Sequence, residues 1–203
     1  MHYDFIEIGT SDFKTLLEES TDSTIGISIE PILLYLDNLP NLPGVKKLNL
    51  AVSDRDSIIN VYWIHPADIE KYNLPYWIRG CNSINSPHPT ASSKLSELNV
   101  SHAYQVSKCR CVSWNTLLIE NQISSIDLLK IDTEGHDSII LKQVASSNLT
   151  VYPKKIIFEH NELSEPTSML SAITMLESLG YVRTSDLSAI DQVLELSTYL
   201  NSK

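Results

Sequence analysis

Residues 132–137 gather three carboxyl groups and a histidine within six positions. Carboxylates and imidazoles can accept the proton of a hydroxyl group, and carboxylate oxygens bind hard cations such as Mg²⁺. The preceding residues 126–131 are mostly apolar, which is typical of a strand buried on both faces in a parallel sheet. Open α/β sheets bind ligands at the carboxyl ends of their strands, so we expect a functional site here.

The candidates for a general base are acids and histidines at strand ends. We predict Asp132, Glu159 and His160 as catalytic residues, with Glu134 and His136 as further candidates for the base. Asp132 with Glu134 is an alternative site for a divalent cation, Mg²⁺ or Mn²⁺. The same residues also fit ordinary helix starts and solvated strand ends.

Acids also follow three earlier apolar runs, as Glu7, Glu30 and Asp54. A carboxylate that closes the second strand of a doubly wound sheet can accept hydrogen bonds from both ribose hydroxyls of a nucleoside. Gly9 would let the first turn approach such a ligand closely. Each residue alone fits an ordinary turn, but together they favour a nucleoside-binding edge.

The turn at residues 7–13 contains a single glycine flanked by acids. A dinucleotide site would instead need several glycines that hold a pyrophosphate on a helix N-terminus. Acids repel pyrophosphate, whereas they suit S-adenosylmethionine (SAM), which carries a sulfonium and an ammonium group. A nicotinamide-dependent oxidoreductase is therefore the less favoured alternative.

The elements that must position these residues alternate between strand and helix. Apolar periodicity predicts strands at residues 3–8, 25–29 and 45–52, with helices at 13–19 and 32–39 between them, a βαβαβ unit with parallel strands. Further strands are predicted at residues 58–64, 104–114, 126–131, 156–159, 181–183 and 189–196, and helices at 93–98, 115–121, 138–144 and 167–179. We predict one α/β domain over residues 1–203.

Residues 65–102 are less regular, and we predict them to form a loop insertion. Its stretch 74–90 is rich in aromatic residues, Pro, Asn and Ser, and long structureless segments within compact domains are usually functional. Aromatic rings pack on sugar faces, and polar side chains bind hydroxyls, although the segment could also simply cover the sheet. The predicted substrate-binding residues are Trp77, Arg79, Asn82, Asn85 and His88, with His136 from outside the insertion.

The composition of the chain argues against some classes of binding partner and location. The formal charge of −10 at pH 7, without a basic stripe, argues against nucleic acid. No apolar run is long enough to span a membrane, and the N-terminus leaves no room for a signal peptide. Three cysteines give no disulfide framework, so we expect a cytoplasmic protein.

Several segments together resemble the FkbM-type family of SAM-dependent methyltransferases. They are residues 7–9, 29–31, 51–54 and 156–159, and above all 126–135, which ends in Leu-Lys-Ile-Asp-Thr-Glu-Gly. The resemblance covers nearly the whole chain. It implies a Rossmann-like class I methyltransferase fold, with a mostly parallel seven-stranded sheet, helices on both faces and a C-terminal antiparallel strand.

The resemblance also implies SAM-dependent O-methylation of a hydroxyl, on a sugar or glycan or on another small molecule. It implies that Glu7 and Gly9 line the methionine end of the cofactor, and Thr10 and Ser11 of the same turn are also expected to bind it. The remaining cofactor residues that it implies are Glu30 at the ribose, Ser53 and Asp54 near the adenine, and Asp132 at the methyl group.

Two features depart from the family pattern. Asp12 and Phe13 replace the glycines usual at the end of the first turn, and the usual N-terminal helices are missing. We therefore also expect that the domain could be fused to other glycan-processing domains. A catalytically silent cofactor-binding module is the alternative outside enzymes.

Overall fold

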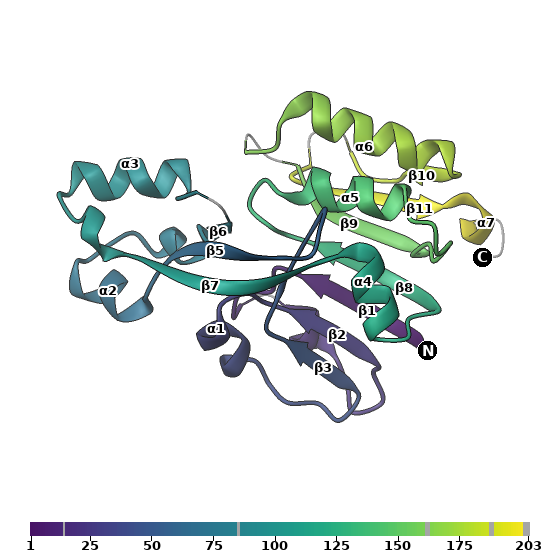
Figure 1. The fold of residues 1–203 in the computed structure, drawn as a ribbon, viewed down its shortest axis with the longest axis horizontal. Coiled ribbons are helices and arrows are strands. Elements are labelled where there is room, and N and C mark those ends of the chain that lie inside the picture. The colour runs from purple at the N-terminus through teal and green to yellow at the C-terminus, as the bar shows by residue number, and fades with distance from the viewer. Residues whose placement is uncertain (14, 85, 161–162, 187–188, 201–203) are drawn as a thin grey trace.

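The computed structural model describes residues 1–13, 15–84, 86–160, 163–186 and 189–200. The main sheet consists of β1 (His2–Ile8), β2 (Gly26–Ile29), β3 (Val45–Leu48), β8 (Ser125–Ile131), β9 (Lys155–Glu159), β10 (Tyr181–Arg183) and β11 (Asp191–Leu196). Its strand order is β3-β2-β1-β8-β9-β11-β10, and β11 runs in the opposite direction to the other six strands (Figure 1). The predicted mostly parallel, seven-stranded sheet is confirmed.

The two central strands, β1 and β8, carry the residues that end at the predicted site. Ile8 pairs with Ile131, so both strands finish at the same edge of the sheet. Ile6 and Leu129 are fully buried, as expected for strands covered on both faces.

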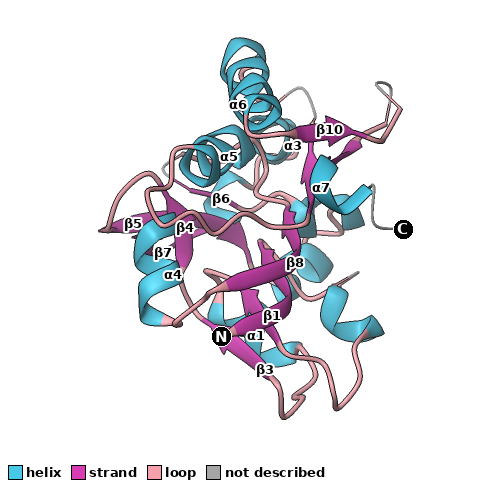
Figure 2. Ribbon diagram, turned by 90° about the vertical axis from the view of Figure 1, so that its right-hand side faces the viewer, coloured by secondary structure: helices cyan, strands magenta, loops and turns pink. Residues whose placement is uncertain are grey.

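Helices cover both faces of this sheet. The helices α4 (Trp114–Glu120), α5 (Asp137–Ala145) and α6 (Pro166–Ser178) share one apolar cluster with Ile27 of β2, and α5 packs beside α6 (Figures 1 and 2). The short helices η1 (Leu16–Glu19) and α1 (Leu33–Asn38) join Val45 of β3 in a separate cluster. Val45 pairs with Gly26 and not with Ile27, so the two clusters lie on opposite faces.

We predicted a single strand over residues 45–52, the third in the chain, and this prediction was wrong. The strand β3 ends at Leu48, and β4 (Ala51–Ser53) belongs to a second sheet with β7 (Tyr104–Ser113), β5 (Ser57–Ile64) and β6 (Ser83–Ile84), in the order β4-β7-β5-β6. Between them, the Asn49 side-chain amide donates hydrogen bonds to the carbonyls of Glu30 and Pro31. These bonds hold the chain where it leaves the main sheet.

The predicted helix at 13–19 is also shorter than expected, because the described residues of this segment form only the 3₁₀ helix η1. The Glu7 carboxylate accepts a hydrogen bond from the Leu16 backbone N–H at 2.9 Å. The backbone donor at the start of this helix is thus satisfied by a buried acid from β1.

Residues 65–102 are a folded insertion and not a loop. They contain α2 (Pro66–Lys71), η2 (Tyr76–Gly80), β6, α3 (Pro89–Glu97) and most of η3 (Ser101–Ala103). A separate apolar cluster that includes Ile69, Leu74, Ile78 and Leu95 holds the helical elements together, and β6 pairs with β5. Proline at the first position of α2 and α3 suits a helix start, which explains why a Pro-rich segment is helical.

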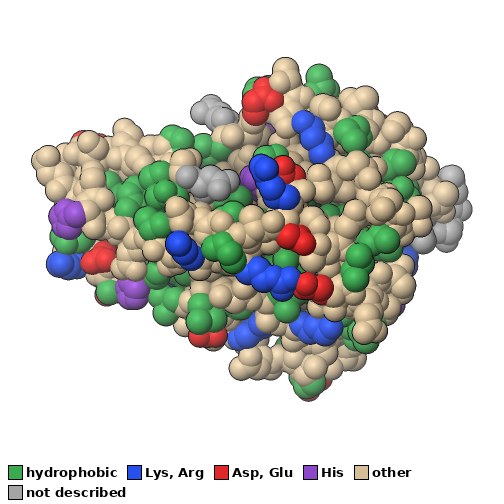
Figure 3. Space-filling view, viewed as in Figure 1, with side chains coloured by type: hydrophobic (Ala, Val, Ile, Leu, Met, Phe, Trp, Pro, Cys, Tyr) green, Lys and Arg blue, Asp and Glu red, His purple; other side chains and the backbone are tan. Residues whose placement is uncertain are grey.

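Charged side chains of both signs are interspersed on the face shown in Figure 3. Among the described residues, no helix is both long enough and apolar enough to cross a membrane.

Candidate active site

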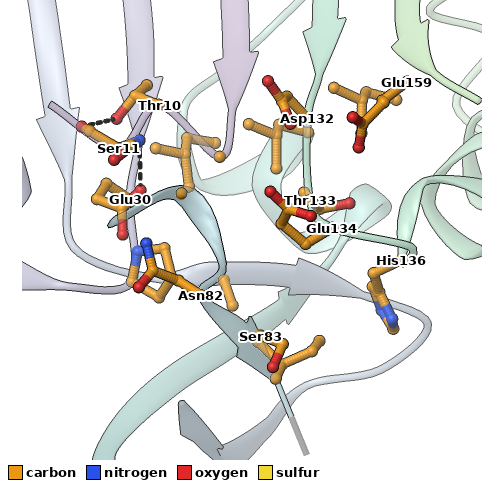
Figure 4. A pocket seen from close by; sticks show the side chains of 18 of the residues that line it. Thr10, Ser11, Glu30, Asn82, Ser83, Asp132, Thr133, Glu134, His136 and Glu159 are labelled. Carbon is orange, nitrogen blue, oxygen red and sulfur yellow. Dashed lines mark hydrogen bonds between the residues drawn. The ribbon is translucent and has the colours of Figure 1, made fainter. Parts of the chain in front are cut away.

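A cavity of about 690 Å³ opens where β1, β2 and β8 end, within the size range of ligand pockets. Residues from the main sheet and from the insertion line it (Figure 4). The cavity thus unites segments far apart in sequence. The residues that line it and were predicted from the sequence are Gly9, Thr10, Ser11, Glu30, Trp77, Asn82, Asp132, Glu134, His136 and Glu159.

The first turn packs directly on the end of the central strand. Gly9 has φ +84°, and a Cβ there would lie 1.8 Å from the Asp132 carbonyl oxygen, so only glycine fits. The Gly9 backbone N–H donates to Ile29 O at 3.0 Å, and the Asp132 N–H donates to Ile8 O at 2.9 Å. These contacts bring three strand ends together at the cavity.

Glu30 is a buried acid held by backbone donors. Its Oε2 accepts a hydrogen bond from the Ser11 N–H at 2.8 Å, and its Oε1 accepts one from the Ile32 N–H at 2.9 Å. Burial raises the pKa of Glu30 to about 7, and the two backbone hydrogen bonds oppose this rise. Because each carboxylate oxygen has two lone pairs, Glu30 can still accept hydroxyls from a ligand.

Apolar side chains line another part of the cavity. Leu50, Ala51 and Val52 come from the segment that leaves the main sheet, and Val61 and Ile84 come from the second sheet. This lining suits a flat apolar ring. The strand order explains the contribution of β5 and β6, which no pattern in the sequence indicated.

Asp132 follows β8 and Glu159 ends β9, and both line the polar end of the cavity (Figure 4). Asp132 is open to solvent through the cavity. Desolvation by the surrounding protein nevertheless raises its pKa to about 7, and the negative charges of Asp137 and Glu134 add to this rise. A carboxyl group with this pKa is suited to proton transfer near neutral pH.

Asp137 fixes the backbone around these acids. It is fully buried and accepts hydrogen bonds from the Thr133 hydroxyl at 2.7 Å and from the N–H groups of Thr133 and Glu159. Burial raises the pKa of Asp137, while these hydrogen bonds lower it. The ends of β8 and β9 are therefore joined through one carboxylate.

Glu7 does not line the cavity, contrary to the role implied by the resemblance. It is fully buried, and its Oε1 accepts a hydrogen bond from the Lys130 ammonium at 2.8 Å. Burial raises the pKa of Glu7, and the Lys130 charge opposes this rise. Lys130 itself lines the cavity, and its polar position within a central strand was the signal that could have identified it.

Ser53 and Asp54, expected near the adenine, do not line the cavity either. The Ser53 hydroxyl lies 2.9 Å from Nε2 of His136, and Asp54 pairs with Arg55. Burial lowers the pKa of His136, and the Asp54 charge opposes this. Ser53 thus orients a cavity histidine from behind.

Of the predicted substrate-binding residues in the described part of the insertion, Trp77 and Asn82 line the cavity. Trp77 lines the cavity together with Tyr76. The exposed fraction is 46% for Trp77 and 68% for Tyr76. Arg79 does not line the cavity but forms a bidentate ion pair with the buried side chain of Asp12, which also accepts a hydrogen bond from Asn38. Arg79 therefore ties the insertion to the first turn.

The remaining predicted residues lie elsewhere. Buried His88 is outside the cavity lining, with its Nε2 3.3 Å from Glu134 Oε2. His160 is exposed and outside the lining, and its backbone N–H donates to Ile190 O. Asn85 lies outside the described residues. Asp191, which pairs with Glu159 across β11 and β9, lines the cavity and was not anticipated.

A cluster of three potential metal ligands occurs elsewhere in the described part of the chain. The ligand atoms of His2, Asp4 and Asp127 lie within 4.8 Å of one another. These residues are near the amino ends of β1 and β8, away from the cavity, and Lys154 already pairs with Asp127 there. The predicted pair of Asp132 and Glu134 is not part of such a cluster.

Comparisons with curated proteins and with solved structures gave no match. The family model described as the methyltransferase FkbM domain matches residues 7–183, which include the end of β1, the folded insertion and the cavity acids Glu30, Asp132, Glu134 and Glu159. The chain therefore belongs to the FkbM methyltransferase domain family.

Proposed function

We propose that this methyltransferase domain uses SAM to methylate a hydroxyl group of a sugar or glycan. The observation that supports this most is Glu30, a buried acid fixed by two backbone N–H groups at the cavity. It is placed to accept the ribose hydroxyls of the cofactor. We also propose that the sheet is a class I methyltransferase sheet, on the basis of its strand order and its antiparallel β11.

The rest of the cavity fits SAM by its chemistry. The apolar side chains of Leu50, Val52 and Ile84 suit the adenine, and Gly9 suits close approach of the methionine portion. SAM supplies an electrophilic methyl group on a positively charged sulfur, and the acids at the other end of the cavity favour positive charge.

Asp132 is our proposed general base. The acceptor oxygen must lie about 3 Å from the methyl carbon, and removal of its proton adds to the rate. Asp132 faces the cavity with a pKa of about 7, so a substantial fraction is ionised at neutral pH. Glu159 is the alternative base in the same cavity, whereas His160 would have to turn inward from its exposed position.

A sugar acceptor suits the aromatic wall of the cavity. Tyr76 and Trp77 offer rings for a sugar face, while Asn82 and His136 offer hydrogen bonds to hydroxyls. A divalent cation at Asp132 and Glu134 is a further proposal, as is fusion to other glycan-processing domains. We also propose a cytoplasmic location, since Cys81, Cys109 and Cys111 are free.

The test is transfer of a labelled methyl group from SAM to a panel of sugars and non-sugar alcohols. We expect an alkali-stable methyl ether on a sugar and formation of S-adenosylhomocysteine (SAH). Methylation of non-sugar alcohols alone would contradict the acceptor class. SAH binding without transfer to any member of the panel would favour a silent module.

A further inference from the structure

His88 is a buried polar side chain that joins the insertion to the cavity acids. Its Nδ1 accepts a hydrogen bond from the Ala91 N–H at 3.3 Å. A neutral imidazole has one acceptor nitrogen and one donor nitrogen, so the proton lies on Nε2. Nε2 lies 3.3 Å from Glu134 Oε2, so the positive end of this N–H group is in close electrostatic contact with the carboxylate.

Asn, Asp, Ser and Thr are the preferred N-cap residues, so the cap of α3 does not by itself require a histidine. The same insertion offers an internal reference. His65 precedes Pro66 and caps α2 by accepting the Ala67 N–H at 3.1 Å, as His88 precedes Pro89 and caps α3. An asparagine could make either cap, but it is too short to extend from the α3 cap to Glu134.

The position of the His88 ring is well defined. The His88 carbonyl accepts hydrogen bonds from the Ser92 N–H at 2.9 Å and from the Tyr104 hydroxyl at 3.2 Å. Together with the Nδ1 contact, these bonds anchor the residue between α3 and β7. The backbone of His88 is thus held by two hydrogen bonds, and its ring is oriented by the Nδ1 contact.

Glu134 is the cavity residue in this contact. Its backbone has φ +51°, a left-handed conformation that L-residues rarely adopt, which directs its side chain away from the regular path of the chain. Oε2 faces His88, whereas Oε1 lies 3.8 Å from the position of a Cβ at Gly80, another residue that lines the cavity. Glu134 therefore lies between the insertion and Asp132.

We propose that His88 is a positioning residue that holds the Glu134 carboxylate toward the methyl acceptor, where Glu134 accepts a hydrogen bond from a second hydroxyl of the acceptor, next to the one that is methylated. This inference rests on the proposed function. As the acceptor oxygen bonds to the methyl carbon, the carbon–sulfur bond breaks, and the hydroxyl proton passes to the Asp132 carboxylate. Glu134 orients the acceptor, and His88 acts only through Glu134.

The test uses two ligands and needs no known acceptor. Sinefungin, a SAM analogue, carries an ammonium group where the transferred methyl would stand, whereas SAH has no group there. Calorimetry on the full chain gives the ratio of their affinities for the wild type and for the His88→Asn, Glu134→Gln and His65→Asn variants. The His65→Asn variant makes the same capping change at α2 and is the matched control.

We expect the preference for sinefungin over SAH to fall at least fivefold in both His88→Asn and Glu134→Gln. The double variant should show no further fall, because the two residues act as a unit. His65→Asn should keep the wild-type ratio, and SAH affinity should change less than twofold in every variant.

An unchanged ratio in His88→Asn or in Glu134→Gln would overturn the inference, as would an equal fall in His65→Asn. If His88→Asn does not fold, Glu134→Gln decides whether the carboxylate faces the methyl position, and a two-dimensional ¹H–¹⁵N spectrum of the wild type decides whether His88 Nε2 carries the proton. Failure of the wild type to bind SAH would instead contradict the proposed function, and the inference with it.

Discussion

The floor and the roof of the cavity are built in different ways. The floor consists of the strand ends of the main sheet, and backbone N–H groups hold its buried acids Glu30 and Asp137. The roof is the folded insertion, residues 65–102, which has its own apolar cluster and joins the floor through the side-chain pairs Arg79–Asp12 and His88–Glu134.

This difference separates two kinds of function. A carboxylate held by backbone donors keeps its position as long as the sheet exists, which suits accurate placement of a cofactor and of the strand ends that carry the base. A roof attached through a few side chains can vary in sequence without disturbing the sheet. We therefore expect floor variants to change cofactor binding or chemistry, and roof variants to change acceptor binding or closure.

The largest effect is expected at Asp132 in the floor. Asp132→Asn keeps the shape of the side chain but removes its charge, so turnover should fall by a factor of about 10² or more, the scale of a lost general base. SAH affinity should change much less. Initial rates at saturating SAM and calorimetry with SAH check both results, and near-normal turnover would move the search for the base to Glu159.

The same variant separates a base from a metal site. If Asp132 and Glu134 hold a divalent cation, a chelator should abolish wild-type activity, and Mg²⁺ or Mn²⁺ should restore it. If Asp132 is a base alone, activity should survive the chelator. The pH–rate profile should then show a limb near pH 7 that the Asp132→Asn variant lacks.

The second floor prediction concerns Glu30. Glu30→Ala should weaken SAH binding by about 1.5–3 kcal/mol, the range for charge-assisted hydrogen bonds. Calorimetry on the folded variant measures the loss. Unchanged affinity would rule out a role of Glu30 at the ribose.

Arg79 tests whether roof and floor are as separate as their construction suggests. The sequence led us to expect that Arg79→Ala would affect only acceptor binding, but the Asp12 partner is buried in the cofactor turn. Leaving that carboxylate without Arg79 should cost about 1–3 kcal/mol of folding free energy, less than for a fully buried pair because Arg79 is partly exposed. It should also weaken SAH binding several-fold. Denaturant unfolding and calorimetry measure the two losses, and a change in acceptor KM alone would contradict the contact.

The smallest effect is expected for Trp77 in the roof. Its partly exposed ring lines the cavity, so Trp77→Ala should raise acceptor KM several-fold through lost ring stacking while SAH affinity stays nearly constant. Initial-rate kinetics with varied acceptor check this. An equal loss of SAH affinity would mean that the roof residue covers the cofactor.

The sequence predicted the floor better than the roof for a physical reason. Buried parallel strands give continuous apolar runs, and a left-handed glycine such as Gly9 marks the turn between strand and ligand. Glu30 and Asp132 could therefore be placed at the edge without coordinates. Nothing in that pattern shows a chain leaving the sheet at Asn49, because this depends on side-chain bonds to Glu30 and Pro31.

The contacts of the roof could not be predicted, because they do not follow from any local pattern in the sequence. Its contacts with the floor are ion pairs between residues far apart in sequence, such as Asp12 with Arg79. In the sequence, Asp12 was only a departure from the usual glycines. Its ion pair with Arg79 explains why an acid stands at this position. The same applies to Ser53, which was expected near the ligand and supports His136 instead.

Calorimetric titration of the wild type with SAH and with NAD at pH 6 and pH 8 tests the central claim most directly. The ribose hydroxyls need an ionised Glu30, whose pKa is about 7, so SAH should bind about tenfold more tightly at pH 8 than at pH 6. Glu30→Gln should bind SAH more weakly and lose this pH dependence, and NAD should bind far more weakly than SAH. Absence of SAH binding, tighter binding of NAD, or the same pH dependence in Glu30→Gln would contradict the account.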